Sequence, residues 1–68
     1  MDYTLEFEQE ADGRWLAEVP ELPGAMAYGA TRDEALLKAE TLALRVLAER
    51  LENSESKPQS IRIALRAA

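Results

Sequence analysis

The chain contains neither cysteine nor histidine. Without cysteine, no disulfide framework and no thiolate zinc site can hold the fold together. Without histidine, the side chain most often used for acid–base chemistry and metal binding is missing as well. We therefore expect packing alone to stabilise the fold, and we expect no metal and no other cofactor.

Long apolar runs and a basic leader are also missing. No apolar run approaches the roughly 20 residues that span a bilayer, and the first ten residues, MDYTLEFEQE, are acidic and alternating. We therefore expect a cytoplasmic protein with no membrane contact. The net charge of −5 argues against direct DNA binding and favours a basic partner, although mild acidity also serves solubility.

What the chain does have is a composition typical of a folded domain, with 47% hydrophobic and 31% charged residues. Its 68 residues allow one small domain, in the size range where a single core is marginal and oligomerisation often supplies the missing burial. We expect residues 1–68 to form this one domain, with no separate DNA-binding domain.

Two stretches near the N-terminus, residues 2–9 and 14–19, alternate apolar and polar side chains, as half-buried strands do. The pair Asp12-Gly13 between them is a strong turn signal. The pattern predicts a hairpin with one apolar face and one polar outer face that carries Glu8 opposite Arg14. Its apolar face would pair Phe7 with Trp15, Leu5 with Ala17 and Tyr3 with Val19.

The stretch PELPG should end the second strand, because its two prolines cannot donate ladder hydrogen bonds and its Gly24 is free to adopt a positive φ. Residues 25–30 are short and apolar, with Met26 and Tyr28 in phase, and predict a third strand beside the second. The stretch has no phosphate-loop pattern, so we interpret it as a bend rather than a ligand-binding loop.

A capping box marks the start of a helix, in which the Thr31 hydroxyl would accept a hydrogen bond from the Glu34 amide and the Glu34 carboxylate one from the Thr31 amide. No glycine or proline interrupts the pattern until NSESKPQ at 53–59, so the helix should run to about Leu51 or Glu52. One apolar stripe along it should pack on the sheet. This stripe comprises Ala35, Ala39, Leu42, Ala43, Val46 and Leu47, with Leu36 at its border.

A second apolar stripe lies on nearly the opposite side of the helix, where leucines recur every seven residues. A monomer would leave this stripe in water, together with Leu16 on the outer face of the sheet. We therefore predict a homo-oligomer, a dimer or a tetramer, or a protein partner. The predicted interface residues are Leu37, Leu44, Ala48, Leu51 and Leu16.

The last segment alternates again, with Ile61, Ile63 and Leu65 on one side and arginines on the other. A strand-helix-strand crossover is right-handed in nearly all cases, so this strand should return parallel to the first. The sequence therefore predicts an α+β fold of β-β-β-α-β order, with a four-stranded mixed sheet in the order 3-2-1-4 and one long helix on one face.

Acidic side chains gather on the predicted outer face of the hairpin, and carboxylates could in principle hold a cation or act in catalysis. Catalytic carboxylates need a pocket that desolvates or couples them, and a single sheet face offers none. Ser54, Ser56 and Ser60 have no histidine base. We therefore expect no enzyme, and we predict an acidic surface for a partner at Asp2, Glu6, Glu8 and Glu18.

The run DGRWLAEVPELPGAMAYGATRDEALLKA resembles the N-terminal domain of HicB-type antitoxins, and the resemblance extends over residues 3–50. Its most specific part is an Asp-Gly turn, an aromatic residue and the segment VPELPG, followed by GATRDEA. The resemblance implies a trimmed ribonuclease H-like fold without that enzyme's catalytic carboxylates. It also implies a cytoplasmic antitoxin that binds a small HicA-type RNA-cleaving toxin, commonly as a dimer or larger oligomer.

Two features depart from that family. Ala25 stands where relatives often carry cysteine, and we expect no ribbon-helix-helix or helix-turn-helix domain of the kind that relatives usually add. Self-repression through DNA is therefore not expected. Our first hypothesis is an antitoxin-like binding module that neutralises a basic toxin, and the alternative is a stand-alone structural or regulatory homo-oligomer with no toxin partner.

Overall fold

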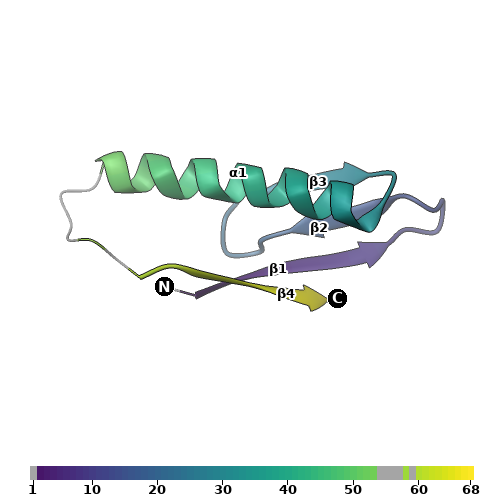
Figure 1. The fold of residues 1–68 in the computed structure, drawn as a ribbon. Helices are drawn as coiled ribbons and strands as arrows, with labels where there is room; N and C mark the ends of the chain where they lie inside the picture. Colours follow the sequence, from purple (N-terminus) through teal and green to yellow (C-terminus); the bar gives the residue numbers. More distant parts are fainter. Residues whose placement is uncertain (1, 54–57, 59) are drawn as a thin grey trace.

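The computed structural model describes residues 2–53, 58 and 60–68. Its elements follow in the order β1 (Asp2–Gln9), β2 (Trp15–Glu18), β3 (Met26–Gly29), α1 (Arg32–Asn53) and β4 (Arg62–Ala67). The strands form one sheet in the order β3-β2-β1-β4, and α1 lies along one face of it (Figure 1). The predicted α+β class, strand order and single helix are confirmed.

Three strand pairs build this mixed sheet. The pairs β1–β2 and β2–β3 are antiparallel, and β4 pairs with β1 in parallel after the chain has passed through α1. The predicted break of the helix in NSESKPQ falls largely outside the described residues. Within them, α1 extends to Asn53.

The register of the first hairpin differs from the prediction by two residues. Phe7 lies opposite Ala17, and Leu16 rather than Arg14 lies opposite Glu8. Because the difference is an even number, every side chain keeps its predicted face. The rings of Phe7 and Trp15 still approach each other as diagonal neighbours, with centroids 6.5 Å apart.

Turn geometry explains the difference. The Glu10 amide donates to the Arg14 carbonyl at 2.7 Å, and the Gly13 amide donates to the Glu10 carbonyl at 3.0 Å. Gly13 has a φ of 91°, as in three-residue hairpin loops that close with a left-handed glycine. The loop is therefore residues 11–13, which centres the hairpin one residue later than the sequence pattern predicts.

The core lies between the sheet and α1, and the helix contributes mainly alanines to it. Ala35, Ala39 and Ala43 are fully buried, and Leu47 is nearly so, while the predicted flanking residues Leu36, Leu42 and Val46 are partly buried. Small side chains let the helix approach the sheet closely. The buried sheet and loop residues are Tyr3, Leu5, Ala17, Val19, Leu22 and Ala25.

The segment between β2 and β3 contributes to this core, which the sequence analysis did not predict. Leu22, inside PELPG, is 1% exposed. The Val19 amide donates to the Ala25 carbonyl at 2.9 Å, so the two ends of the bend are tied together. Gly24 has the predicted positive φ, at 89°. The bend is thus a packed loop that closes one end of the core.

The helix begins with half of the predicted capping box. The Glu34 amide donates to the Thr31 hydroxyl at 3.1 Å, as expected. The Glu34 carboxylate, however, accepts from the Ala30 amide at 3.3 Å instead of the Thr31 amide. It also accepts from Lys38 Nζ at 3.2 Å, one turn along the helix. The carboxylate therefore links the incoming chain to the second turn of α1.

Candidate interaction surfaces

The outer face of the sheet, opposite α1, carries the four predicted acidic residues Asp2, Glu6, Glu8 and Glu18. Glu6 and Glu18 lie directly opposite each other in the β1–β2 pairing. Like charges in such a pair repel, and the repulsion is strongest where the side chains are shielded from water. This arrangement needs a neighbouring cation, and the fold supplies one.

That cation comes from β4. Arg66 lies opposite Glu6 in the parallel register, and its Nη2 is 3.1 Å from Glu6 Oε2. Arg62 lies opposite Asp2 in the same way, at a looser 3.9 Å between Nε and Oδ1. The predicted acidic surface is therefore divided: its β4 side is neutralised within the sheet.

Glu8 and Glu18 form the part of this surface whose charge is not balanced. Neither makes an ion pair with any described residue. Glu8 is exposed and Glu18 is half-buried. Both flank Leu16 in the sheet, since Glu8 lies opposite Leu16 on β1 and Glu18 lies two residues further along β2. The acidic surface thus borders an apolar residue rather than a hydrophilic one.

Leu16 belongs to a larger apolar group that the sequence analysis missed. Its partner on β3 is Tyr28, and the partner of Glu18 is Met26. Tyr28 is 40% exposed and Met26 is 48% exposed. We call Leu16, Met26 and Tyr28 the outer apolar strip. The two β3 residues were visible in the sequence as an in-phase pair, but their face depends on the pairing with β2.

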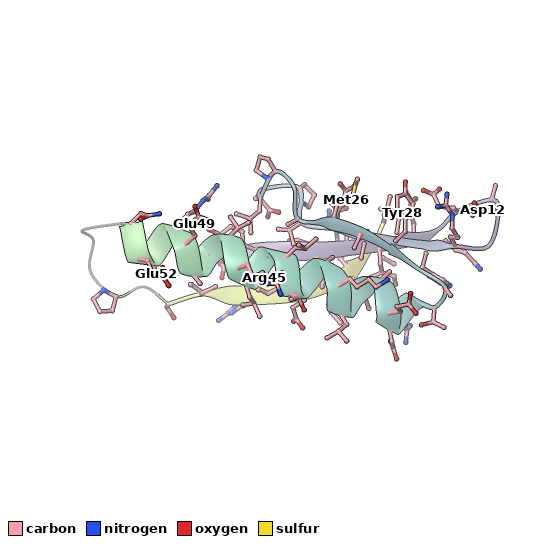
Figure 2. The ribbon with its side chains drawn as sticks, turned by 90° about the horizontal axis from the view of Figure 1, so that it is seen from above. Asp12, Met26, Tyr28, Arg45, Glu49 and Glu52 are labelled. Carbon is pink, nitrogen blue, oxygen red and sulfur yellow. The ribbon has the colours of Figure 1, made fainter. Side chains whose placement is uncertain are left out.

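Figure 2 shows Met26 and Tyr28 side by side on β3, with Asp12 at the far end of the same margin. The guanidinium carbon of Arg14 lies 4.6 Å from the centre of the Tyr28 ring. Asp12 holds that arginine in place, because its Oδ1 accepts from the Arg14 amide at 3.0 Å and its Oδ2 from Nε at 2.8 Å. These bonds keep the pKa of Asp12 below its ordinary value of 3.8.

The second predicted surface lies on α1, on the side away from the sheet. We call Leu37, Leu44, Ala48 and Leu51 the leucine ridge. Its leucines are 65%, 52% and 42% exposed in chain order, and Ala48 is exposed too. The fold thus separates the ridge from Leu16, with which the prediction grouped it: the ridge lies on the helix and Leu16 on the opposite face of the sheet.

A groove of about 410 Å³ runs beside the ridge, between α1 and β3. Ala27, Leu37 and Leu42 form its apolar lining. Lys38 and Arg45 are basic and border it, with Thr41. Arg45 lies on α1, away from the margin that carries Met26 and Tyr28 (Figure 2). The groove on this side of the helix therefore has a basic border, whereas Glu8 and Glu18 border Leu16 on the outer face of the sheet.

The described residues also lack two kinds of site. Among the described residues, no three acidic side chains come close enough together to hold a metal ion. In the same part of the chain, no helix has the length and apolar character that a membrane crossing requires. Both candidate surfaces are open to solvent and suited to contact with another macromolecule.

Comparison with known proteins gives one relative of similar length. The UPF0150 protein Ta0767 of Thermoplasma acidophilum is 35% identical over 57 residues, which cover 84% of this chain and 81% of the relative. No family model matches the chain, and no solved structure gives a significant match.

Proposed function

The chain belongs to the UPF0150 family, and on that premise we propose that it is a cytoplasmic HicB-like binding module of antitoxin type. In this role it binds a small basic RNA-cleaving toxin of HicA type and blocks its active site. The proposal joins two independent supports: the ordered HicB-like segments described above, and an outer sheet face whose chemistry suits a basic protein partner.

One observation carries the proposal. Met26 and Tyr28 of the outer apolar strip are exposed and Leu16 is half-buried, and the carboxylates that border the strip, Glu8 and Glu18, form no ion pair with any residue that the structure describes. Apolar anchors supply most of the affinity of a protein interface, while complementary charge at its border speeds the encounter. A partner with an apolar anchor ringed by lysine or arginine would satisfy both halves of this surface.

The experiment is a binding assay with charge-matched variants. A small basic protein recovered in complex with this chain from native cells is purified, and its association with this chain is followed by stopped flow at low and high salt. The variant Glu8→Arg/Glu18→Arg should associate more slowly at low salt, with the difference shrinking at high salt. The control Glu49→Arg/Glu52→Arg changes the net charge equally on α1 (Figure 2) and should associate almost as fast as the wild type.

Neutralisation is measured in parallel as protection of RNA from cleavage by the same basic protein. Tyr28→Ala should weaken protection by removing an anchor from the outer apolar strip. The proposal fails if native cells yield no small basic protein in complex with this chain and expression of the chain rescues no toxin-arrested cells. If the sheet and helix charge variants slow association equally, the basic protein does not bind specifically at the outer face of the sheet.

The leucine ridge favours a second candidate, a structural or regulatory homo-oligomer with no toxin partner. Three leucines exposed along one helix are a large apolar surface for a chain of this size. In this case Leu44→Glu should lower the sedimenting mass while leaving the circular dichroism of the helix unchanged. An unchanged mass with an intact fold rules out the ridge as the interface.

We propose neither role as catalytic. The paired arrangement of Glu6 with Arg66 and the exposure of Glu8 favour charge balance and partner binding over acid–base work. If a preparation cleaves RNA, the variant Glu6→Ala/Glu8→Ala decides the matter: lost activity would make this chain an enzyme, and unchanged activity would identify a contaminant.

A further inference from the structure

β4 is an edge strand whose inner face is poorly covered. It pairs with β1 on one side, and in the described part of the chain no strand pairs with its other side (Figure 1). Within the same residues, α1 packs against β1, β2 and β3 but makes no close contact with β4. Leu65 shares the inner face with Leu5, its partner on β1, yet Leu65 is 61% exposed while Leu5 is 1% exposed.

The free edge of β4 presents a defined set of backbone groups. The Ala68 amide donates to the Phe7 carbonyl of β1 at 2.9 Å. Because successive peptide groups of a strand point to opposite sides, residues 62, 64 and 66 also direct their N–H and C=O groups toward β1. The groups of Ile63, Leu65 and Ala67 therefore point to the open edge, and their side chains all lie on the inner, apolar face.

β4 has few of the features that usually keep an edge strand from pairing. Natural edge strands are usually short, bulged or broken by proline, or they carry charged side chains. The charges of β4, Arg62 and Arg66, lie on its outer face beside Asp2 and Glu6. β4 has six residues, no proline or glycine and no inward charge. β3, at the other edge of the sheet, has only four residues and ends in Gly29. Of the two sheet edges, β4 is thus the one suited to pairing with another strand.

The geometry points to a second copy of this chain as the occupant: two β4 strands pair antiparallel, with Leu65 on the two-fold axis. This register pairs the edge groups of Ile63 with those of Ala67 in the second copy and those of Leu65 with each other. It covers the exposed Leu65 with its symmetry mate. It also places Arg66 opposite Ala64 of the second copy, whereas a register centred on Ala64 would set Arg62 against Arg66.

The distribution of charge favours the β4 edge over other parts of the surface as the contact between two copies of the chain. Each chain carries a net charge of −5, so most faces of two copies repel. β4 contains no acidic residue, and its two arginines are matched by Asp2 and Glu6 of the same chain. The edge is therefore locally balanced. The two-fold axis runs perpendicular to the sheet, so both helices lie on the same face of one continuous sheet.

This dimer goes beyond the antitoxin proposal and uses an interface different from the leucine ridge. Its test exploits the absence of native cysteine. In Leu65→Cys, the two thiols face each other across a hydrogen-bonded pair with Cα atoms about 5.5 Å apart, within the range for a disulfide. In the control Ala67→Cys, the two equivalent residues are displaced by about 13 Å along the strands, too far for a bond.

We expect wild-type chain to sediment as a dimer or a larger even-numbered assembly, and Leu65→Cys to oxidise to a covalent dimer much faster than Ala67→Cys. Leu65→Lys should dissociate the β4 contact without loss of helix signal, because the side chain is exposed in the single chain and two ammonium groups would meet on the axis. The matched control Leu37→Lys, on α1, should leave the covalent capture of Leu65→Cys unchanged.

Four results would overturn the inference. The first is a monomeric mass at high protein concentration, and the second is cross-linking no faster at position 65 than at position 67. The third is dissociation by Leu37→Lys but not by Leu65→Lys, which would assign self-association to the helix. The fourth is cross-linking to a different protein in native extracts, with none between copies, which would show that the β4 edge pairs with a strand of that protein. None of these measurements uses the toxin, so they stand apart from the antitoxin proposal.

Discussion

Arg66 on β4 donates a hydrogen bond from Nη2 to Oε2 of Glu6 on β1 at 3.1 Å, although the two residues are 60 positions apart in the chain. The Glu6 side chain is 22% exposed and also faces Glu18 from the other neighbouring strand. Arg66 therefore offsets the repulsion between two carboxylates while it joins the last strand to the first.

Replacing this arginine should destabilise the fold more than replacing its neighbour. Arg66→Ala should lower the free energy of unfolding by about 0.5–1 kcal/mol, the range for partly exposed pairs. Arg62→Ala removes a looser contact between side chains that are 82% and 80% exposed, and its effect should be close to zero. Urea unfolding at low salt measures the stability of both variants. Equal losses of stability would contradict the conclusion that Arg66 offsets the repulsion between Glu6 and Glu18.

The helix cap makes a second prediction. Thr31→Ala should lower the free energy of unfolding by about 1 kcal/mol, because the Glu34 amide loses its acceptor. Thr31→Ser keeps the hydroxyl and should retain most of the stability. Urea unfolding followed by the helix signal makes the comparison, and a serine variant as unstable as the alanine variant would show that the methyl group, not the cap, matters.

Acid should weaken the fold in part through Glu34. The hydrogen bond and charge of Lys38, together with the Ala30 amide, hold the pKa of this carboxyl below its ordinary value of 4.5. A folded-state pKa that is lowered gives stability that is present above pH 4.5 and is lost as the pH falls through the folded value.

The test is the difference in stability between wild type and Glu34→Gln. This difference should favour the wild type at pH 7, shrink below pH 4.5 and vanish in stronger acid, as measured by thermal unfolding across that range. Glu49→Gln removes a carboxylate of the same helix without these two partners and serves as the control. A pH-independent difference for Glu34→Gln would refute the linkage.

Gly29 should tolerate substitution least among the glycines, because β3 approaches the start of α1 closely at this residue. A Cβ added there would lie 2.5 Å from the Ala35 amide nitrogen and 3.0 Å from Glu34 Cβ. Gly29→Ala should therefore cost about 1–3 kcal/mol, as overpacking does. Gly13 has open space around it but a positive φ, so Gly13→Asn, which tolerates that backbone conformation, should be mild. A harmless Gly29→Ala would mean that the helix can shift away.

The two sides of α1 should respond differently to truncation. Leu47 is 3% exposed, so Leu47→Ala should cost about 2–5 kcal/mol. Leu44 is 52% exposed, and Leu44→Ala should cost less than about 0.5 kcal/mol in dilute solution. Chemical unfolding at low and high protein concentration separates the cases, since a larger effect of Leu44→Ala at high concentration would indicate an intermolecular role for the ridge.

Much of this molecule follows from the sequence through local periodicity. Alternation assigned Tyr3 and Leu5 to the buried face of β1, and the helical repeat separated the buried Ala39 from the exposed Leu44. These assignments depend only on the geometry of one strand or one helix. For the same reason the start of α1 was readable from Thr31, whose hydroxyl caps a neighbour three residues away.

Contacts between segments required the tertiary structure. The left-handed conformation of Gly13 centres the hairpin one residue later than the alternation pattern predicts, and this register sets Glu6 opposite Glu18. The parallel return of β4 then places Arg66 beside Glu6. Periodicity reports the face of a residue but not its neighbour on another strand, because register depends on turn geometry and on packing between distant segments. The faces of this protein were thus determined by its sequence, and the outer apolar strip and the open edge of β4 by its fold.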